Sequence, residues 1–145
     1  MPDFHEPTIA TLLASASRDV TANGAAVGRF QAKECIQVVL DVTAAASAAD
    51  DELDVVVSVS PDGGTTWLPA VAFPTVLGNG GAKRYVAELL PKWADPATST
   101  VDISADPSPG DVRPYLLGTH LKAVGTITNG AGTHTFTYGV TAIGR

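Results

Sequence analysis

The octapeptide SPDGGTTW at 60–67 constrains the fold of this chain more than any other segment. An alternating apolar run at 53–60 leads into it, and a second apolar run at 67–73 follows it. The proline presets its own φ, the aspartate side chain accepts bonds from backbone amides of the turn, and the two glycines allow a positive φ. The segment therefore predicts a β-hairpin with a braced turn, whose structural residues are Ser60, Asp62, Gly63, Gly64, Thr66 and Trp67.

Period-two alternation recurs along the rest of the chain and predicts further strands. Asn23-Gly24 predicts a second hairpin turn, and Pro69 places the strand at 67–73 at a sheet edge or at a bulge. The further strands are expected at 8–14, 18–21, 27–30, 36–42, 83–90, 112–128 (bent at Gly118) and 133–143, with a short candidate at 100–104.

About eight or nine antiparallel strands, with no helix between them, predict an all-β fold, a single-domain β-sandwich or jelly roll. The domain is expected at 8–145, and an N-terminal arm at 1–7. The last strand is expected to direct one face into the core, formed by Phe136, Tyr138, Val140 and Ala142.

The charge pattern argues against nucleic acid and anionic membranes as partners. The chain carries 15 acidic and 9 basic residues, a net charge of −6. Its basic residues are dispersed, with Lys83-Arg84 as the one adjacent pair. Nucleic acids and anionic membranes are bound through clustered basic residues, and the sequence has no such cluster.

Cys35 is the single cysteine, so no intrachain disulfide forms, which is typical of proteins made in a reducing cytoplasm. Its apolar neighbours at 36–40 favour a small buried side chain over a catalytic thiol. Residues 1–7 lack the apolar core of a signal peptide, and no apolar run is long enough to span a bilayer.

Side chains that carry chemistry are sparse and scattered. Asp50, Asp51, Glu52 and Asp54 form the densest acidic run, which is interpreted as a solvated loop, with a weak calcium site as the alternative. The three histidines have no metal-ligand spacing, and the chain has no nucleophile elbow and no phosphate-binding loop. We therefore predict that the protein is not an enzyme and binds no cofactor.

Five residues are candidate contacts with a partner. Phe4 and His5 belong to the arm, where ordering on binding would add contact area. Trp93 lies in an irregular segment and either anchors a partner or plugs the open end of the sandwich. Arg113 and Tyr115 form an exposed contact patch, or Arg113 bonds loop carbonyls at the sheet margin while Tyr115 enters the core.

The octapeptide resembles the Asp-box of sialidases and related β-propellers, in which the box braces a turn and does not touch substrate. A propeller repeats the box once per blade, whereas this chain has one copy. The sialidase arginine cluster and tyrosine nucleophile do not map onto this chain. The resemblance therefore supports a structural role for the turn and not sialidase activity.

Over nearly its whole length the chain resembles the small all-β virion proteins of tailed bacteriophages, in particular capsid decoration proteins. The segments that carry the resemblance are TLLAS at 11–15, GAAV at 24–27, LDVTA at 40–44, LDV at 53–55, SVSPDGGTTW at 58–67, Phe73 and FTYGVT at 136–141.

The resemblance implies a structural protein that binds the lattice of the phage major capsid protein and stabilises it. It implies a location on the capsid surface of the virion after synthesis in the host cytoplasm, and a homo-oligomer, for which a homotrimer is expected. Two alternatives remain: a neck or tail protein of the same virion, and a carbohydrate-binding module for host attachment in which Trp67 or Trp93 stacks on sugar.

Overall fold

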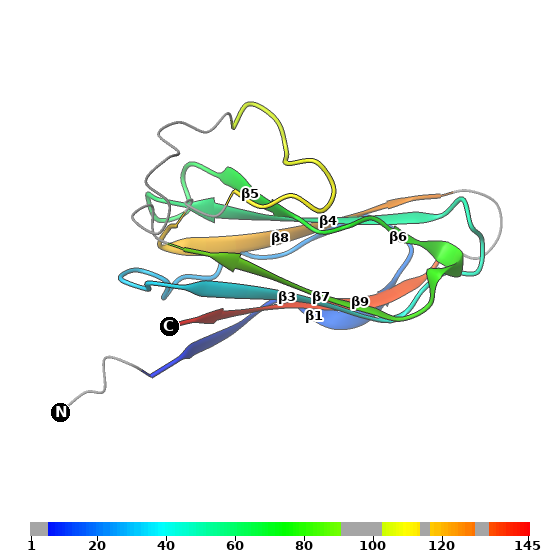
Figure 1. Cartoon of the computed structure of the whole chain (residues 1–145), viewed down its shortest axis with the longest axis horizontal. Helices are drawn as coiled ribbons and strands as arrows, with labels where there is room; N and C mark the ends of the chain where they lie inside the picture. Colours follow the sequence, from blue (N-terminus) through cyan, green and yellow to red (C-terminus); the bar gives the residue numbers. More distant parts are fainter. Residues whose placement is uncertain (1–5, 91–102, 114–116, 130–133) are drawn as a thin grey trace.

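The computed structural model describes residues 6–90, 103–113, 117–129 and 134–145. Within these ranges, nine strands form two antiparallel sheets that lie face to face (Figure 1). This arrangement confirms the predicted all-β sandwich and the expected number of strands.

The first sheet has four strands, in the order β1-β9-β3-β7. β3 (Ile36–Ala44) and β9 (Phe136–Gly144) are central, and β1 (Thr8–Arg18) and β7 (Lys83–Leu89) are the two edges. β7 keeps an unbroken register with β3, whereas β1 has two register shifts against β9.

The second sheet has five strands: β2 (Ala22–Asn23), β8 (His120–Thr128), β4 (Glu52–Ser60) and β5 (Leu68–Ala72) in that order, with β6 (Val76–Leu77) also paired to β4. β4 and β5 form the predicted hairpin around the turn at 60–67. The register between them shifts between Val57 and Ser58, and Ser58 lies opposite Pro69. A proline donates no ladder bond, so its place at an irregularity of an outer strand follows the prediction.

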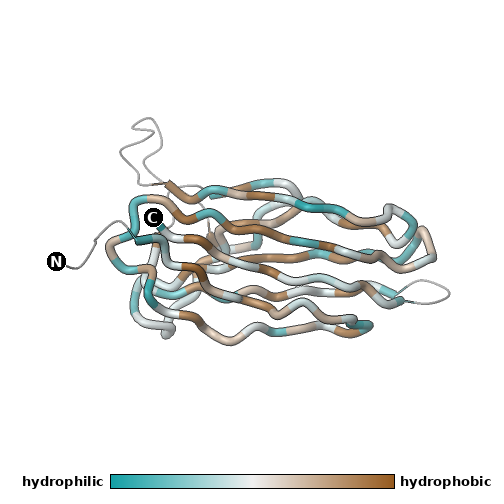
Figure 2. The backbone as a smooth tube through the Cα atoms, turned by 90° about the horizontal axis from the view of Figure 1, so that it is seen from below, coloured by the Kyte–Doolittle hydropathy of each residue, from teal (hydrophilic) through white to brown (hydrophobic). Residues whose placement is uncertain are grey.

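The core lies between the two sheets and is made by alternate residues of the long strands. Along the strands of the four-stranded sheet, apolar and polar segments alternate (Figure 2). Each fully buried Val, Leu, Ile or Phe contributes roughly 1.5–3 kcal/mol through removal of apolar surface from water. The predicted core face of β9 is confirmed, since four residues there are fully buried: Phe136, Tyr138, Val140 and Ala142.

The predicted hairpin at Asn23-Gly24 is wrong. β1 runs from Thr8 to Arg18, and Asn23 pairs with Val124 of β8 in the other sheet. Gly24 lies where two backbones meet: a Cβ on it would stand 2.4 Å from the carbonyl oxygen of Leu12. The glycine is therefore needed for close approach as the chain crosses between sheets.

The predicted long strand at 112–128 is also wrong in its first part. β8 begins at His120, and Val112 instead forms an isolated bridge with Val71 of β5. Likewise, Val27 forms one bridge with Leu121 in place of the strand expected at 27–30. Of the short candidate at 100–104, residues 103 and 104 are not in a strand, and the others lie outside the described residues.

The segment at 103–113 arches over the outer side of the five-stranded sheet (Figure 1). It is held to β5 by three backbone bonds: Ala72 N–H to the Asp111 carbonyl, Gly110 N–H to the Ala72 carbonyl and Arg113 N–H to the Ala70 carbonyl. The outer face of that sheet is thus partly covered by this chain itself.

Candidate functional site

The turn at 60–67 is organised around the buried hydroxyl of Ser60. This hydroxyl donates to Asp62 Oδ1 at 2.8 Å and accepts from the Gly64 N–H at 2.7 Å. Asp62 Oδ1 also accepts from the Thr66 N–H at 2.7 Å, which closes the turn. Gly63 and Gly64 have φ of 75° and 99°, a region that favours glycine.

The turn stabilises the charged form of its aspartate. Bonds from Thr66, first from its backbone and then from its side chain, together with the bond from Ser60, lower the pKa of Asp62 from its usual 3.8 to about 2. The carboxylate is therefore ionised at every physiological pH. All of these bonds lie within the turn, so the charge serves to hold the loop.

Two residues before β8 attach this turn to the rest of the sheet. The Thr119 N–H donates to the Ser60 carbonyl at 2.8 Å, and its hydroxyl accepts from the Gly63 N–H at 3.2 Å. A Cβ on Gly118 would lie 2.4 Å from the Ser60 carbonyl oxygen, so only glycine fits there. The contact of Gly118 and Thr119 with the turn was not predicted, because nothing within the octapeptide indicates a partner almost sixty positions away.

Trp67 ends the turn with its ring against a cation. The ammonium of Lys122 on β8 lies 4.3 Å from the ring centroid, a cation–π contact between the end of the turn and β8. Sugars stack on open aromatic faces, and this contact occupies one face of the Trp67 ring.

Of the five candidate contact residues, the structure describes Arg113. Its guanidinium donates to the carbonyls of Pro69 at 2.9 Å and Ala105 at 2.7 Å, which ties the overlying segment to β5. This geometry is that of an arginine at the sheet margin bonding loop carbonyls. The other four candidates lie outside the described residues: Phe4, His5, Trp93 and Tyr115.

The acidic run at 50–54 is divided between the interior and the surface. Asp51 is fully buried, and its Oδ1 lies 2.7 Å from Nδ1 of His134. Asp54 accepts a bond from the Thr75 hydroxyl. Among the described residues, no group of three His, Cys, Asp or Glu side chains is arranged to hold a metal ion.

Cys35 precedes β3 and is partly buried. Its backbone pairs with that of Arg145, with N–H to carbonyl distances of 3.1 and 2.9 Å. Burial, followed by the nearby charge of Glu88, raises the pKa of its thiol, so the thiolate is disfavoured.

The outer face of the four-stranded sheet is a surface that the sequence did not single out. One row of residues in register crosses all four strands: Thr11, Thr141, Val39 and Val86. A neighbouring row begins with Ile9 beside Ile143, and Ile9 and Val86 are 69% and 59% exposed. We name these six residues the neutral strip. The signal was present in the sequence as the second face of the alternating runs, although alternation alone does not show which outer faces line up across strands.

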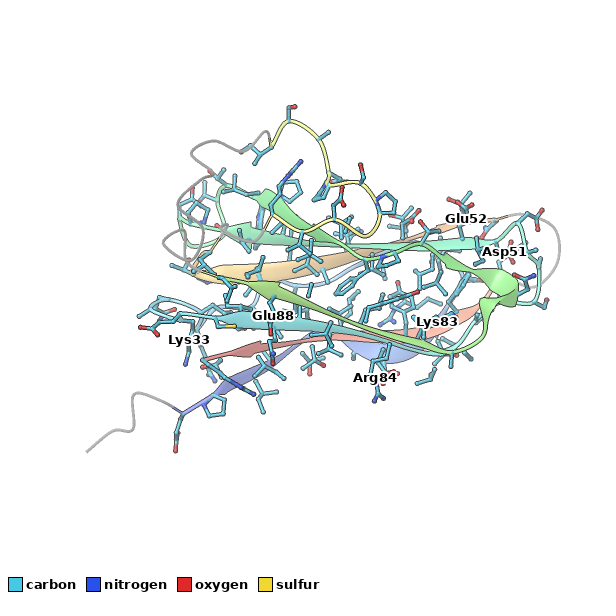
Figure 3. The ribbon with its side chains drawn as sticks, in the orientation of Figure 1. Lys33, Asp51, Glu52, Lys83, Arg84 and Glu88 are labelled. Carbon is cyan, nitrogen blue, oxygen red and sulfur yellow. The ribbon has the colours of Figure 1, made fainter. Side chains whose placement is uncertain are left out.

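Charged and polar pairs flank the neutral strip on the same face. Arg84 of β7 bonds Asp41 of β3 through two contacts of 3.2 and 3.1 Å. The amide of Gln37 donates to Glu88 at 2.8 Å. Arg84 and Glu88 lie apart along β7 (Figure 3), with Val86 between them. The face therefore presents uncharged β-branched side chains between the Arg84–Asp41 ion pair and the Gln37–Glu88 pair.

No helix of the described residues is long and apolar enough to cross a membrane. Comparisons of the chain with protein families, with curated proteins and with solved structures gave no match.

Proposed function

We propose that this protein is a structural component of a tailed-bacteriophage virion that decorates the capsid by binding the lattice of major capsid protein subunits. Its role is to hold neighbouring shell subunits together. A ligand that binds only the assembled shell stabilises it by mass action. The proposal requires no enzymatic step and no cofactor.

The observation that supports this proposal is the neutral strip. It crosses all four strands of one sheet in register, and its residues are uncharged and β-branched. Protein–protein interfaces are depleted of charge at their centre and polar at their rim, and here Asp41, Arg84 and Glu88 supply the rim. A sheet held by a packed core keeps such a face rigid, so little order has to be gained on binding.

The experiment mixes purified protein with phage heads that lack it and measures the temperature at which the heads rupture. We expect a rise that saturates with protein concentration. In Val39→Lys, an ammonium at the centre of the neutral strip is desolvated without a partner, and the affinity for heads falls by roughly tenfold or more.

A matched control lies on the opposite sheet. Val124 of β8 is likewise half-buried on an outer face, next to Val56. Val124→Lys is expected to leave head binding unchanged. Equal loss of binding in both variants, or no rise in rupture temperature with the unmodified protein, contradicts the proposal.

The same protein also tests the two alternative roles. Co-purification with tails, and no binding to heads, would place it at the neck or tail. Binding on a glycan array that is lost in Trp67→Ala would instead indicate a carbohydrate-binding module.

A further inference from the structure

β7 is an edge strand that contains no proline and no β-bulge against β3, two features by which edge strands usually avoid pairing with another chain. Its seven residues, Lys83–Leu89, run opposite β3 without a register shift. Every second residue of such a strand directs its N–H and C=O away from the sheet, where a further strand can bond them. The other edge, β1, is interrupted by two register shifts.

The sequence of β7 is complementary to itself in antiparallel alignment. If two copies pair about a two-fold axis at Val86, Arg84 of each lies opposite Glu88 of the other. Val86, 59% exposed in the single chain, then lies opposite itself on the outer face. On the inner face, Tyr85 lies opposite Ala87, a large side chain beside a small one.

The paired rows also continue the contacts already present within one copy. Arg84 bonds Asp41 of its own β3, so in the pair it lies between two carboxylates, Asp41 and Glu88 of the second copy. The central row becomes Val39, Val86, Val86 and Val39. Opposite charges and β-branched pairs directly across two strands are favourable, whereas like charges there are unfavourable.

We propose that a second copy of this chain docks on β7, so that two four-stranded sheets join into one continuous sheet about a two-fold axis. Charge complementarity favours a second copy of β7 as the partner, in this register. A shift by two residues places Arg84 opposite Val86, so the pairing of Arg84 with Glu88 is lost. The pairing extends the neutral strip across both copies. This two-fold dimer is an alternative to the homotrimer expected from the resemblance. It is independent of the virion role, because purified protein alone is enough to form it.

The first test measures the molar mass and dissociation constant by sedimentation equilibrium. An interface of one edge strand is small, so we expect a dimer with a dissociation constant on the order of 100 µM, sampled between about 10 µM and about 1 mM. Arg84→Glu and Glu88→Arg each place like charges opposite one another twice, and each weakens the dimer roughly tenfold or more. A 1:1 mixture of the two variants restores opposite charges at both positions and therefore associates as a heterodimer.

Circular dichroism of each variant reports whether it folds, and recovery in the mixture separates lost pairing from lost folding. Val20→Lys is the matched control, because Val20 is 65% exposed but lies outside the strands. Monomers throughout the concentration range, a trimeric mass, or equal dissociation constants for all variants overturn the proposal.

The second test reads the register directly. Residues opposite each other in antiparallel strands have Cα atoms about 4.5–5.5 Å apart, which a disulfide can bridge. In a Cys35→Ser background, Val86→Cys is expected to form a disulfide-linked dimer on mild oxidation much faster than Val20→Cys. Equal rates for the two variants overturn the two-fold register.

Discussion

Replacement of Gly125 by alanine should destabilise the protein through one contact in the core. Gly125 lies on β8 between Ala22 and Val55 of the flanking strands, and the ring of Tyr138 points at it from the other sheet. A Cβ there would lie 2.0 Å from the Tyr138 hydroxyl and 2.7 Å from Cζ. Ordinary contacts are about 3.5–4.0 Å, so the ring or the strand has to move.

The size of the effect follows from two opposing terms. Overpacking a well-packed core costs typically ~1–3 kcal/mol, and the overlap here places this case near the upper end. Alanine also raises the free energy of unfolding by about 0.5–1 kcal/mol relative to glycine, because a glycine in a strand loses more backbone entropy on folding. We therefore expect Gly125→Ala to lower the free energy of unfolding by about 2 kcal/mol.

The assay is urea unfolding of Gly125→Ala in three backgrounds: Tyr138, Tyr138→Phe and Tyr138→Leu. The phenylalanine ring still brings Cζ within 2.7 Å of the new methyl group, whereas leucine clears it. The cost should thus fall in the order Tyr, Phe, Leu, and the coupling free energy between Gly125→Ala and Tyr138→Leu should approach the whole overpacking term, about 3 kcal/mol. The same cost in all three backgrounds would refute the steric argument.

Three further predictions concern the turn. The folded-state pKa of Asp62 is about 2, below its usual 3.8, so its charge stabilises the fold above about pH 4, and this stabilisation is lost as the pH falls from about 4 towards 2. An NMR titration of the Thr66 amide should have its midpoint near 2. A midpoint near 3.8 would contradict the bonding described. Ser60→Ala should cost about 1–3 kcal/mol in urea unfolding, because it removes the buried hydroxyl that bonds Asp62 and leaves the partly buried Gly64 amide without its acceptor. Ser58→Ala, on the outer face, should change stability by less than ~0.5 kcal/mol. Gly118→Ala should cost at least as much as Ser60→Ala and should shift the amide resonances of the turn, since its Cβ would displace the Ser60 carbonyl; an unshifted spectrum would show that the two segments are not in contact.

Strands with strict alternation were predictable because their signal is local. The runs at 36–42, 53–60, 83–90 and 133–143 correspond to β3, β4, β7 and β9, whose ends lie within three residues of the predicted bounds. Each of these strands buries one face. The Pro-Asp-Gly-Gly turn was equally readable, since its bonds connect residues a few positions apart. The order of the strands within each sheet could not be predicted, because β3 pairs with β9 about a hundred residues away and no local pattern specifies that partner.

The errors have a common origin in segments whose backbone pairs with strands distant in the sequence. The apolar residues at 112–128 look continuous, but Val112 bridges to β5 while 120–128 pair with β4, so one run serves two partners. For the neutral strip, alternation separates the two faces of each strand, but it does not show which residues align across the four strands. That alignment depends on register, which the tertiary fold determines.

The structural role of individual glycines was the hardest property to predict from the sequence. In a β chain it supplies either a positive φ or room for another backbone or ring, and the sequence does not distinguish the two uses. At Gly63 the φ is 75° and an added Cβ would meet nothing within 4 Å, so glycine is needed there for its conformation. Gly24, Gly118 and Gly125 are not among the residues with positive φ, and each would bring a Cβ within 2.4 Å of an atom of a distant segment. These three glycines therefore set how closely β1, β4 and β9 approach β8 and its neighbours. The geometry of the sandwich depends on glycine at these positions as much as on the apolar side chains of the core.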